Sequence, residues 1–512
     1  MIRSPNMDWV ATHRWQLLVG GELADSAEDG TFDCVSPVTG QVLCQLPDAT
    51  ETDVDLAVER ATRAAAEWAR VSLPDRARRV WRLAQVVRSH CEELAALDAV
   101  DVGNAYRPML VDVENGALGM EFMADAGFAL AGATLPATAT HLHYTVREPF
   151  GVVARIVAFN HPIMFAIQKI AAPLVAGNAV ILKPSEHSSL SALRMGEILA
   201  PHLPPGLLSV LTSAGAAMPQ AIVRHPGIPR IGFIGSEPTG RTSQRTAAEA
   251  GLKDVTLELG GKNAMIICPD VDLDEAAASA VKGMNFSGWQ SQSCSSTSRV
   301  FVHDDIADEL VARIAERAGA IRIGPPLDPD TEMGTLASKE QYEKTLRYID
   351  QARAAGARAV CGGTPVARTD LPDGHYVEPT VFVDVDPDSA LACEEVFGPV
   401  LSIFRWSDES ELLAAVNRVR YGLTAAIWTN DLSRALRLAS QVQAGYVWIN
   451  DAATHFTGVP FGGQKASGIG REESVEELQS YTQLKSINIR LDHENRDTPA
   501  TTASKTAKEP TA

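Results

Sequence analysis

The chain is expected to fold as an α/β protein built on largely parallel sheets. Short apolar runs bounded by turn residues recur along the chain and are typical of buried strands. They occupy residues 151–159, 179–184, 230–235, 264–269, 299–303, 401–406 and 425–430. Helical stretches such as 190–200 and 306–319 lie between many of these runs. This alternation favours parallel sheets covered by helices.

Two amphipathic helices are predicted before the first of these strands, over residues 53–68 and 76–100. In the second, Val80, Leu83 and Cys91 fall on one apolar stripe with the spacing of a buried helix face. We therefore assign Cys91 to packing.

Residues 134–150 interrupt the pattern, because polar and apolar side chains alternate there as in an exposed β-ribbon. His141 and His143 could contribute to a metal site. With no third ligand nearby, a solvated strand face is favoured, and we expect no metal. Residues 493–512 lack apolar content and are expected to form a disordered tail.

Size and charge narrow the class of protein. The 512 residues should form two or three domains. A net charge of −19 disfavours binding to nucleic acid or anionic membranes. An acidic surface that keeps the protein soluble is a sufficient explanation of this charge. The 7 cysteines are scattered and never spaced as CxxC, which indicates a reducing compartment. No apolar run is long enough to span a membrane. We expect a cytoplasmic protein.

Cys294 lies among small polar residues in SGWQSQSCSSTSR (287–299), surroundings that suit a reachable, ionisable thiol. A single cysteine is more often a small buried hydrophobe. Glu258, in LELGGK (257–262), lies 36 residues before Cys294 and is flanked by leucines. A carboxylate in an apolar strand is costly unless it is paired or functional, and burial would raise its pKa toward that of a general base. The alternative is a solvent-facing Glu on an edge strand.

Three strand ends carry further candidates. GSEPTG (235–240) has the strand–turn–helix pattern that brings N–H groups to a phosphate. LKPSE (182–186) places a Lys and a Glu where a ribose could bind. Asn160 could donate a hydrogen bond to an oxyanion. Taken singly, each is better explained as an ordinary turn or loop.

Taken together and in order, these motifs resemble the aldehyde dehydrogenase superfamily, in its NAD(P)-dependent, non-CoA-acylating form. The resemblance extends from about residue 15 to residue 490. It also rests on Arg299, EEVFGP (394–399), YGL (421–423), GYVWIN (445–450), PFGG (460–463) and LQSYTQLKS (478–486).

The resemblance implies a Rossmann-like NAD-binding domain, an α/β catalytic domain and a small β-ribbon for oligomerisation. We place the first at 1–133 and 151–257, the second at 258–466, and the ribbon at 134–150 and 475–492. Members of the family share this ribbon between subunits, so a homodimer or homotetramer is expected.

The resemblance also implies the catalytic roles. Cys294 would be the nucleophile, and Asn160 with the backbone N–H of Cys294 would form the oxyanion hole. After hydride transfer leaves a thioester, Glu258 would activate water and release the carboxylic acid. A CoA-acylating or semialdehyde dehydrogenase on the same fold is the alternative, as is a non-catalytic structural paralogue. The CoA-acylating branch typically lacks the glutamate at position 258.

The implied cofactor-binding residues lie at strand ends and in one later loop. They are Lys183 and Glu186 at the adenosine ribose, Gly235 and Ser236 at the pyrophosphate, and Glu395 and Phe397 at the nicotinamide end. A carboxylate at the ribose accepts from a 2′-hydroxyl but repels a 2′-phosphate. Glu186 therefore predicts NAD over NADP.

The positions that would line the aldehyde tunnel are mostly apolar and carry no Arg or Lys. They are His161, Met164, Ile167, Trp289, His455 and Phe456. Ile167 and Met164 are the most typical of plain core packing. We expect an uncharged aromatic or medium-chain aldehyde as the substrate.

The chain departs from the family pattern beside the nucleophile. Ser291 and Gln292 stand where Gly-Gln is usual, and Phe159 replaces the usual Trp before Asn160. Trp289 lies in a segment slightly longer than in common members.

Overall fold

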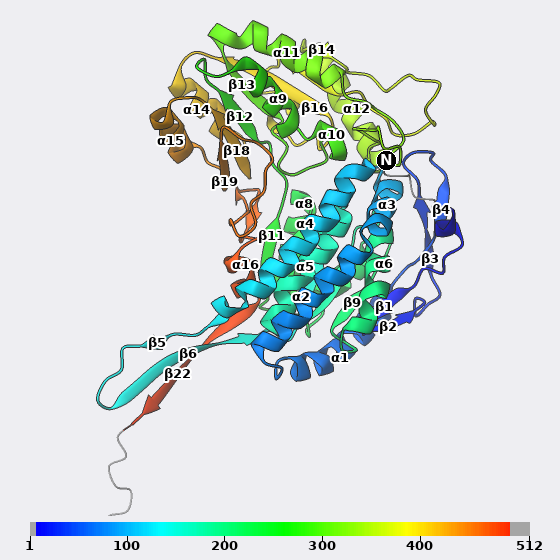
Figure 1. Ribbon diagram of the computed structural model, residues 1–512, viewed down its shortest axis with the longest axis vertical. Coiled ribbons are helices and arrows are strands. Elements are labelled where there is room, and N and C mark those ends of the chain that lie inside the picture. The colour runs from blue at the N-terminus through cyan, green and yellow to red at the C-terminus, as the bar shows by residue number, and fades with distance from the viewer. Residues whose placement is uncertain (1–6, 492–512) are drawn as a thin grey trace, which may run out of the picture.

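The computed structural model describes residues 7–491, so the tail expected at 493–512 lies outside the described residues. Figure 1 shows two α/β bodies and a β-ribbon that projects away from them. Within residues 7–491, no helix is both long enough and apolar enough to cross a bilayer.

The first body is built on an eight-stranded sheet with the order β2-β1-β9-β8-β7-β10-β11-β21. Its central strands are parallel: β7 (Val152–Ile156), β8 (Ala179–Lys183), β9 (Leu208–Val210), β10 (Arg230–Ile234) and β11 (Asp254–Glu258). The edges are β1 (Leu17–Val19), β2 (Glu22–Ala24) and β21 (Gly468–Ile469). Strand order reverses between β7 and β10, the position where ligands bind at the carboxyl ends of such sheets.

The second body is built on a seven-stranded sheet with the order β14-β15-β16-β13-β12-β18-β19. Only β14 (Arg358–Cys361) is antiparallel to its neighbour. The parallel strands are β15 (Thr380–Val383), β16 (Val400–Trp406), β13 (Arg299–His303), β12 (Ala264–Ile267), β18 (Thr424–Trp428) and β19 (Tyr446–Ile449). The apolar runs predicted as strands all form strands, so the α/β prediction is confirmed.

Helices cover both sheets. Those of the first body are α1 (Glu51–Trp68), α2 (Leu73–Ser89), α3 (Cys91–Val102), α4 (Tyr106–Asp125), α5 (Pro162–Ala176), α6 (Leu190–Leu199), α7 (Ala217–Arg224) and α8 (Glu237–Ala250). Those of the second are α9 (Leu273–Gly283), α11 (Ala307–Gly319), α12 (Lys339–Ala354), α14 (Glu409–Asn417) and α15 (Leu432–Gln441).

The single helix predicted over 76–100 is wrong, because the chain leaves helical geometry at His90 and forms α2 and α3. Helix α2 buries one stripe, whereas α3 is buried on nearly every side from Leu94 to Val102. One straight helix could not satisfy both patterns.

The ribbon consists of β5 (Thr134–Leu135), β6 (His141–Pro149) and β22 (Thr482–Arg490), with β6 in the centre. Strand β22 pairs with β6 along its whole length, which joins segments far apart in the sequence. Residues 475–480, which we grouped with the ribbon, form helix α16 (Val475–Ser480) instead.

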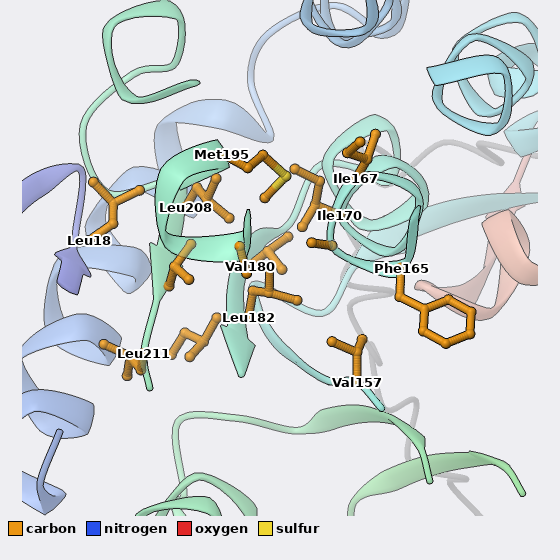
Figure 2. Packing of buried hydrophobic residues seen from close by; sticks show 14 of the residues in the cluster. Leu18, Val157, Phe165, Ile167, Ile170, Val180, Leu182, Met195, Leu208 and Leu211 are labelled. Carbon is orange, nitrogen blue, oxygen red and sulfur yellow. The ribbon is translucent and has the colours of Figure 1, made fainter. Parts of the chain in front are cut away.

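The core of the first body lies between its sheet and α5. Figure 2 shows Ile170 of α5 beside Val180 and Leu182 of β8, whereas the Phe165 ring points away from this cluster. Ile167 is also fully buried here, which agrees with its assignment to packing. Helix α5 thus has one face for the core and another for the site described below.

A buried ion cluster connects the C-terminal segment to the first body. Arg155 of β7 donates to Glu472 at 2.7 Å and to the hydroxyl of Tyr481. Lys169 of α5 lies 2.8 Å from Glu472 and 3.8 Å from Glu477. Burial opposes ionisation of Glu472, but Arg155 and Lys169 outweigh it and lower its pKa to about 2.

Removing Arg155 should therefore destabilise the protein strongly. For Arg155→Met we expect a loss of about 3 kcal/mol, because breaking a buried ion pair leaves its partner poorly compensated. The measurement is the thermal unfolding midpoint at a fixed scan rate. Arg358→Met is the control, since Arg358 pairs with Asp384 at the exposed surface and such pairs contribute about 0–1 kcal/mol. Equal midpoints for the two variants would contradict a structural role for the cluster.

Candidate active site

A cavity of about 1020 Å³ lies where the two bodies meet. It is lined by residues that follow the parallel strands of the first sheet and by residues that precede strands of the second. Pockets for small ligands measure roughly 300–1,000 Å³, so this cavity can hold a large cofactor and a substrate together.

The strand ends of the first sheet bring the predicted residues into one cavity. Asn160 follows β7, Lys183 ends β8, Ser236 follows β10 and Glu258 ends β11. The backbone of Asn160 is fixed by buried Asn104, whose Nδ2 donates to the Asn160 carbonyl at 2.9 Å. The open α/β topology is sufficient to gather these side chains.

Lys183 and Glu186 form a pair at the end of β8. Lys183 Nζ lies 3.3 Å from Glu186 Oε2, and the carboxylate is partly exposed to the cavity. Burial opposes ionisation of Glu186, but the ammonium of Lys183 lowers its pKa. The pair therefore offers both an anionic acceptor and a cationic donor.

The turn after β10 closes around the N-terminus of α8. Ser236 caps this helix, and its Oγ accepts from the backbone N–H of Thr239 at 3.4 Å. At Gly235 a β-carbon would lie 2.7 Å from the ring of Phe233, so only glycine fits. This end of the helix belongs to the cavity lining, and the free N–H groups of a helix N-terminus favour a bound anion.

Glu395 and Phe397 approach from the second body. Glu395 Oε1 accepts from the N–H of Gly261 at 2.8 Å. Burial raises the pKa of Glu395, and this hydrogen bond offsets part of the rise. Phe397 has a positive φ of 58° and meets Phe159 edge-on at 5.7 Å between ring centroids.

Glu258 is a buried carboxyl group with no hydrogen-bond partner on either oxygen among the described residues. Its exposed fraction is only 6%. Burial and the charge of Glu472 raise its pKa well above the ordinary 4.5, although Lys169 and Arg471 oppose the rise. Such a group is suited to accept a proton near neutral pH.

Cys294 lies on the loop before β13 and lines the same cavity. Buried Asn263 holds this loop: its Nδ2 donates to the carbonyls of Cys294 at 2.7 Å and Ser296 at 2.9 Å. Burial, together with the charges of Glu395 and Glu258, raises the pKa of the thiol above its ordinary 9.0. We expected polar surroundings that favour ionisation, but the isolated chain holds a neutral thiol here.

Arg299 does not reach this thiol. It is buried beneath the loop and donates to the carbonyls of Lys262, Ala415 and Val416. Its role is to anchor β13.

The loop carrying Cys294 has left-handed backbone at Asn285, Gln290 and Ser291. Ser291 has φ of 59°, its side chain is buried, and its Oγ has no partner among the described residues. Gln292 is buried too and accepts from the N–H of Ala337 at 3.2 Å. Neither Ser291 nor Gln292 lines the cavity, whereas Phe159 and Trp289, where the chain also departs from the family pattern, do.

One wall of the cavity is organised by buried Asp112 of α4. Its Oδ2 accepts from His161 Nδ1 at 2.9 Å and from Trp289 Nε1 at 3.2 Å. The ring centroids of His161 and Trp289 lie 5.1 Å apart. Asp112 thus fixes His161 and Trp289, two of the predicted tunnel residues. Asp112 itself was not predicted from the sequence.

His455 also lines the cavity, and its Nδ1 lies 3.1 Å from Glu473 Oε2. Burial opposes protonation, but Glu473 raises the pKa of His455. Phe456, predicted to line the tunnel, does not belong to the cavity wall, and 51% of it is exposed. Ala453, Thr454 and Thr457 of the same turn also line the cavity, whereas Phe456 points to solvent.

Helix α5 contributes a polar residue that sequence reasoning missed. His161, Met164, Phe165 and Gln168 all line the cavity. Their spacing of i, i+3, i+4 and i+7 places them on one helix face, so the positions predicted for His161 and Met164 would also have indicated Gln168. A β-carbon at Gly119 of α4 would lie 2.7 Å from Gln168, so this glycine makes room for the amide.

Comparison with known proteins gives a consistent result. The family model described as the aldehyde dehydrogenase family matches residues 24–487. Aldehyde dehydrogenase tropH of Talaromyces stipitatus is 46% identical over 483 residues, which is 93% of each chain.

Solved structures of similar proteins contain NAD+. An aldehyde dehydrogenase from Bacillus cereus in complex with NAD+ is 35% identical, with a TM-score of 0.91 over 95% of this chain and 99% of that one. An indole-3-acetaldehyde dehydrogenase from P. syringae, in complex with NAD+ and IAA, is 35% identical, with a TM-score of 0.90 over 93% and 97% of the two chains.

Ser291→Gly should stabilise the protein by about 1 kcal/mol, because a left-handed backbone is costly for a residue with a β-carbon. The change also removes a buried hydroxyl that has no partner. The measurement is the shift of the thermal midpoint. Ser293→Gly is the control: Ser293 has no positive φ and its Oγ bonds that of Ser295, so a decrease is expected. A lower midpoint for Ser291→Gly would contradict the strain.

Proposed function

Because the chain belongs to the aldehyde dehydrogenase family, we propose that it oxidises an aldehyde to the carboxylic acid through Cys294, with NAD as the hydride acceptor. The observation that supports this most directly is that Cys294, Glu258 and Asn160 line one cavity together with the strand ends suited to a dinucleotide. The overall reaction converts aldehyde, NAD+ and water into acid, NADH and a proton.

The residues present fit NAD. Lys183 and Glu186 would hold the adenosine ribose, because an ionised carboxylate accepts from sugar hydroxyls and an ammonium donates to them. The turn at Gly235 and Ser236 would hold the pyrophosphate at the N-terminus of α8. Glu395 would hold the second ribose. NAD, when bound, accepts the hydride that leaves the aldehyde carbon.

Acylation requires Cys294 to give its proton to water, as the proton that the overall reaction releases, and to bond to the aldehyde carbon. The raised thiol pKa favours the neutral thiol over the thiolate before this step. Asn160, as a buried side-chain amide beside the nucleophile, would donate to the oxyanion that forms. Loss of hydride from this adduct leaves a thioester on Cys294.

Deacylation depends on Glu258. Its carboxylate takes a proton from water, the hydroxide adds to the thioester carbon, and the Cys294 sulfur leaves as the acid forms. A carboxyl group with no hydrogen-bond partner and a raised pKa is the right kind of base for this step. Its presence favours hydrolysis over transfer of the acyl group to CoA.

The cavity walls favour an uncharged substrate. Aromatic and apolar side chains, including Phe122, Phe165 and Phe461, line the cavity. Lys169, the ammonium on this side, is already bound to Glu472. His455 of this wall lies against Glu473, so no described Lys or Arg of the wall is left unpaired to hold a substrate carboxylate, which supports an aromatic or medium-chain aldehyde over a semialdehyde acid.

We infer that the ribbon mediates a homodimer or homotetramer. Leu135 of β5 and Leu484 and Ile489 of β22 are exposed apolar side chains on this projecting element. A second copy would cover them.

Glu258→Gln should stall the enzyme at the thioester. We expect a burst of about one NADH per active site followed by very slow turnover, because acylation proceeds and deacylation lacks its base. Cys294→Ala should abolish both phases. Rapid mixing of enzyme, NAD and aldehyde measures the burst.

In the unaltered enzyme, kcat should fall as pH drops through a pKa higher than that of an ordinary glutamate, since only the carboxylate works as a base. Normal steady-state turnover by Glu258→Gln would exclude this role.

Glu186 should set the preference for NAD over NADP. In Glu186→Gln we expect the ratio of kcat/KM for NADP to that for NAD to rise about tenfold or more, because a carboxylate repels a 2′-phosphate. Glu249→Gln changes the net charge equally on the exposed side of α8 and is the control. An unchanged ratio in Glu186→Gln, or equal use of both cofactors by the unaltered enzyme, would contradict the assignment.

A further inference from the structure

We propose that the aldehyde carries a hydroxyl group on an aromatic ring, and that His161, His455 and Gln168 recognise this hydroxyl. This inference rests on the proposed function and names the substrate class of the same site. It depends on three polar side chains that line the cavity. Gln168 keeps a buried oxygen without a partner in the described part of the chain, and each histidine has its Nδ1 against a carboxylate, which leaves its Nε2 for a ligand.

His161 presents an acceptor. Its Nδ1 lies 2.9 Å from the carboxylate of Asp112, which can only accept, so this nitrogen carries the proton. In the neutral ring Nε2 is then an acceptor, and no hydrogen bond joins it to another described residue. Trp289 Nε1 donates to the same carboxylate, which holds the indole ring beside that of His161.

His455 presents a donor. Its Nδ1 pairs with Glu473, and its ring centroid lies 6.1 Å from that of Tyr446 and 4.7 Å from that of Phe461. Glu473 and, more weakly, Asp112 raise the pKa of His455 against the effect of burial, which favours the imidazolium. When the ring is protonated, its Nε2–H is left to donate, because no hydrogen bond joins Nε2 to another described residue. Both histidines line the same cavity.

Gln168 supplies the strongest evidence for a polar ligand. Its exposed fraction is 9%, and its Oε1 has no hydrogen-bond partner among the described residues. Gly119 leaves the space that this side chain occupies. A buried amide oxygen without a partner costs roughly 1–3 kcal/mol, so a ligand that donates to it would gain that free energy.

A hydroxyl group matches this set better than other substituents. It can donate to Gln168 or His161 and accept from His455 at once, because one oxygen carries both functions. A carboxylate on the substrate would be repelled by the acidic side chains of Asp112, Glu472 and Glu473, which line the cavity. An alkyl group would leave the polar atoms unpaired once water is displaced.

The rings around these groups favour an aromatic scaffold. Trp289, Phe165 and Phe461 line the same space, and His161 lies 5.5 Å from Phe165. A flat ring can stack against such walls while its hydroxyl points to the polar groups.

The test compares benzaldehyde with 3-hydroxybenzaldehyde, 4-hydroxybenzaldehyde and their methyl ethers, using NADH formation by the intact enzyme. We expect at least one hydroxylated compound to exceed benzaldehyde about tenfold or more in kcat/KM, and its methyl ether to lose the advantage. In Gln168→Leu and in His455→Phe the ratio of hydroxylated to unsubstituted aldehyde should fall toward one. His202→Phe, at an exposed position far from the cavity, is the control and should keep the ratio.

Two results would overturn the inference. One is equal or higher kcat/KM for benzaldehyde than for both hydroxylated compounds in the unaltered enzyme. The other is an unchanged ratio in both variants. Activity on apolar aldehydes with no hydroxyl preference refutes this inference alone, whereas no NADH from any aldehyde refutes the proposed function. If a variant does not fold, the comparison of phenols with their methyl ethers on the unaltered enzyme decides the question.

Discussion

The buried ion cluster around Glu472 is the interaction on which the site depends. Arg155 and Lys169 both bind Glu472, so the cations of this region are occupied. Glu258 lies close by and receives no such partner. The pKa of Glu472 is thus lowered while that of Glu258 is raised, and the difference comes from which carboxylate the cations reach. The same cluster ties the C-terminal segment to the first sheet.

The two sheets then determine which side chains line the cavity. Parallel strands place their carboxyl ends on one edge, and that edge carries Asn160, Lys183, Ser236 and Glu258. The second sheet brings the amino end of β13, where the loop holding Cys294 ends. Cys294 from one body and Glu258 from the other, the proposed nucleophile and base, line one cavity because the two edges face each other. This division also leaves room for a long cofactor on one side and a substrate on the other.

Much of this could be predicted from the sequence because the signals are local. Apolar runs marked the strands, and strand-end motifs marked the residues that follow them. The break at His90 was missed, because an apolar stripe does not show that the next helix is buried on every side. Phe456 was placed in the tunnel and lies outside it, since a loop's direction depends on what it packs against. Asp112 was missed because its partners, His161 and Trp289, are distant from it in the sequence, and Gln168 because the helix period was not extended beyond Ile167.

The sequence by itself determined the α/β class, the order of the strand-end motifs and the family that they resemble, because backbone periodicity and short motifs are encoded by near neighbours. Only the tertiary structure decided that the Cys294 thiol is neutral at rest, that Glu258 is unpaired, and that His161 and His455 are each held by a carboxylate. Burial and charge pairing act through space between residues far apart in the chain. The polarity of the substrate wall is therefore a property of the fold, and no single segment contains it.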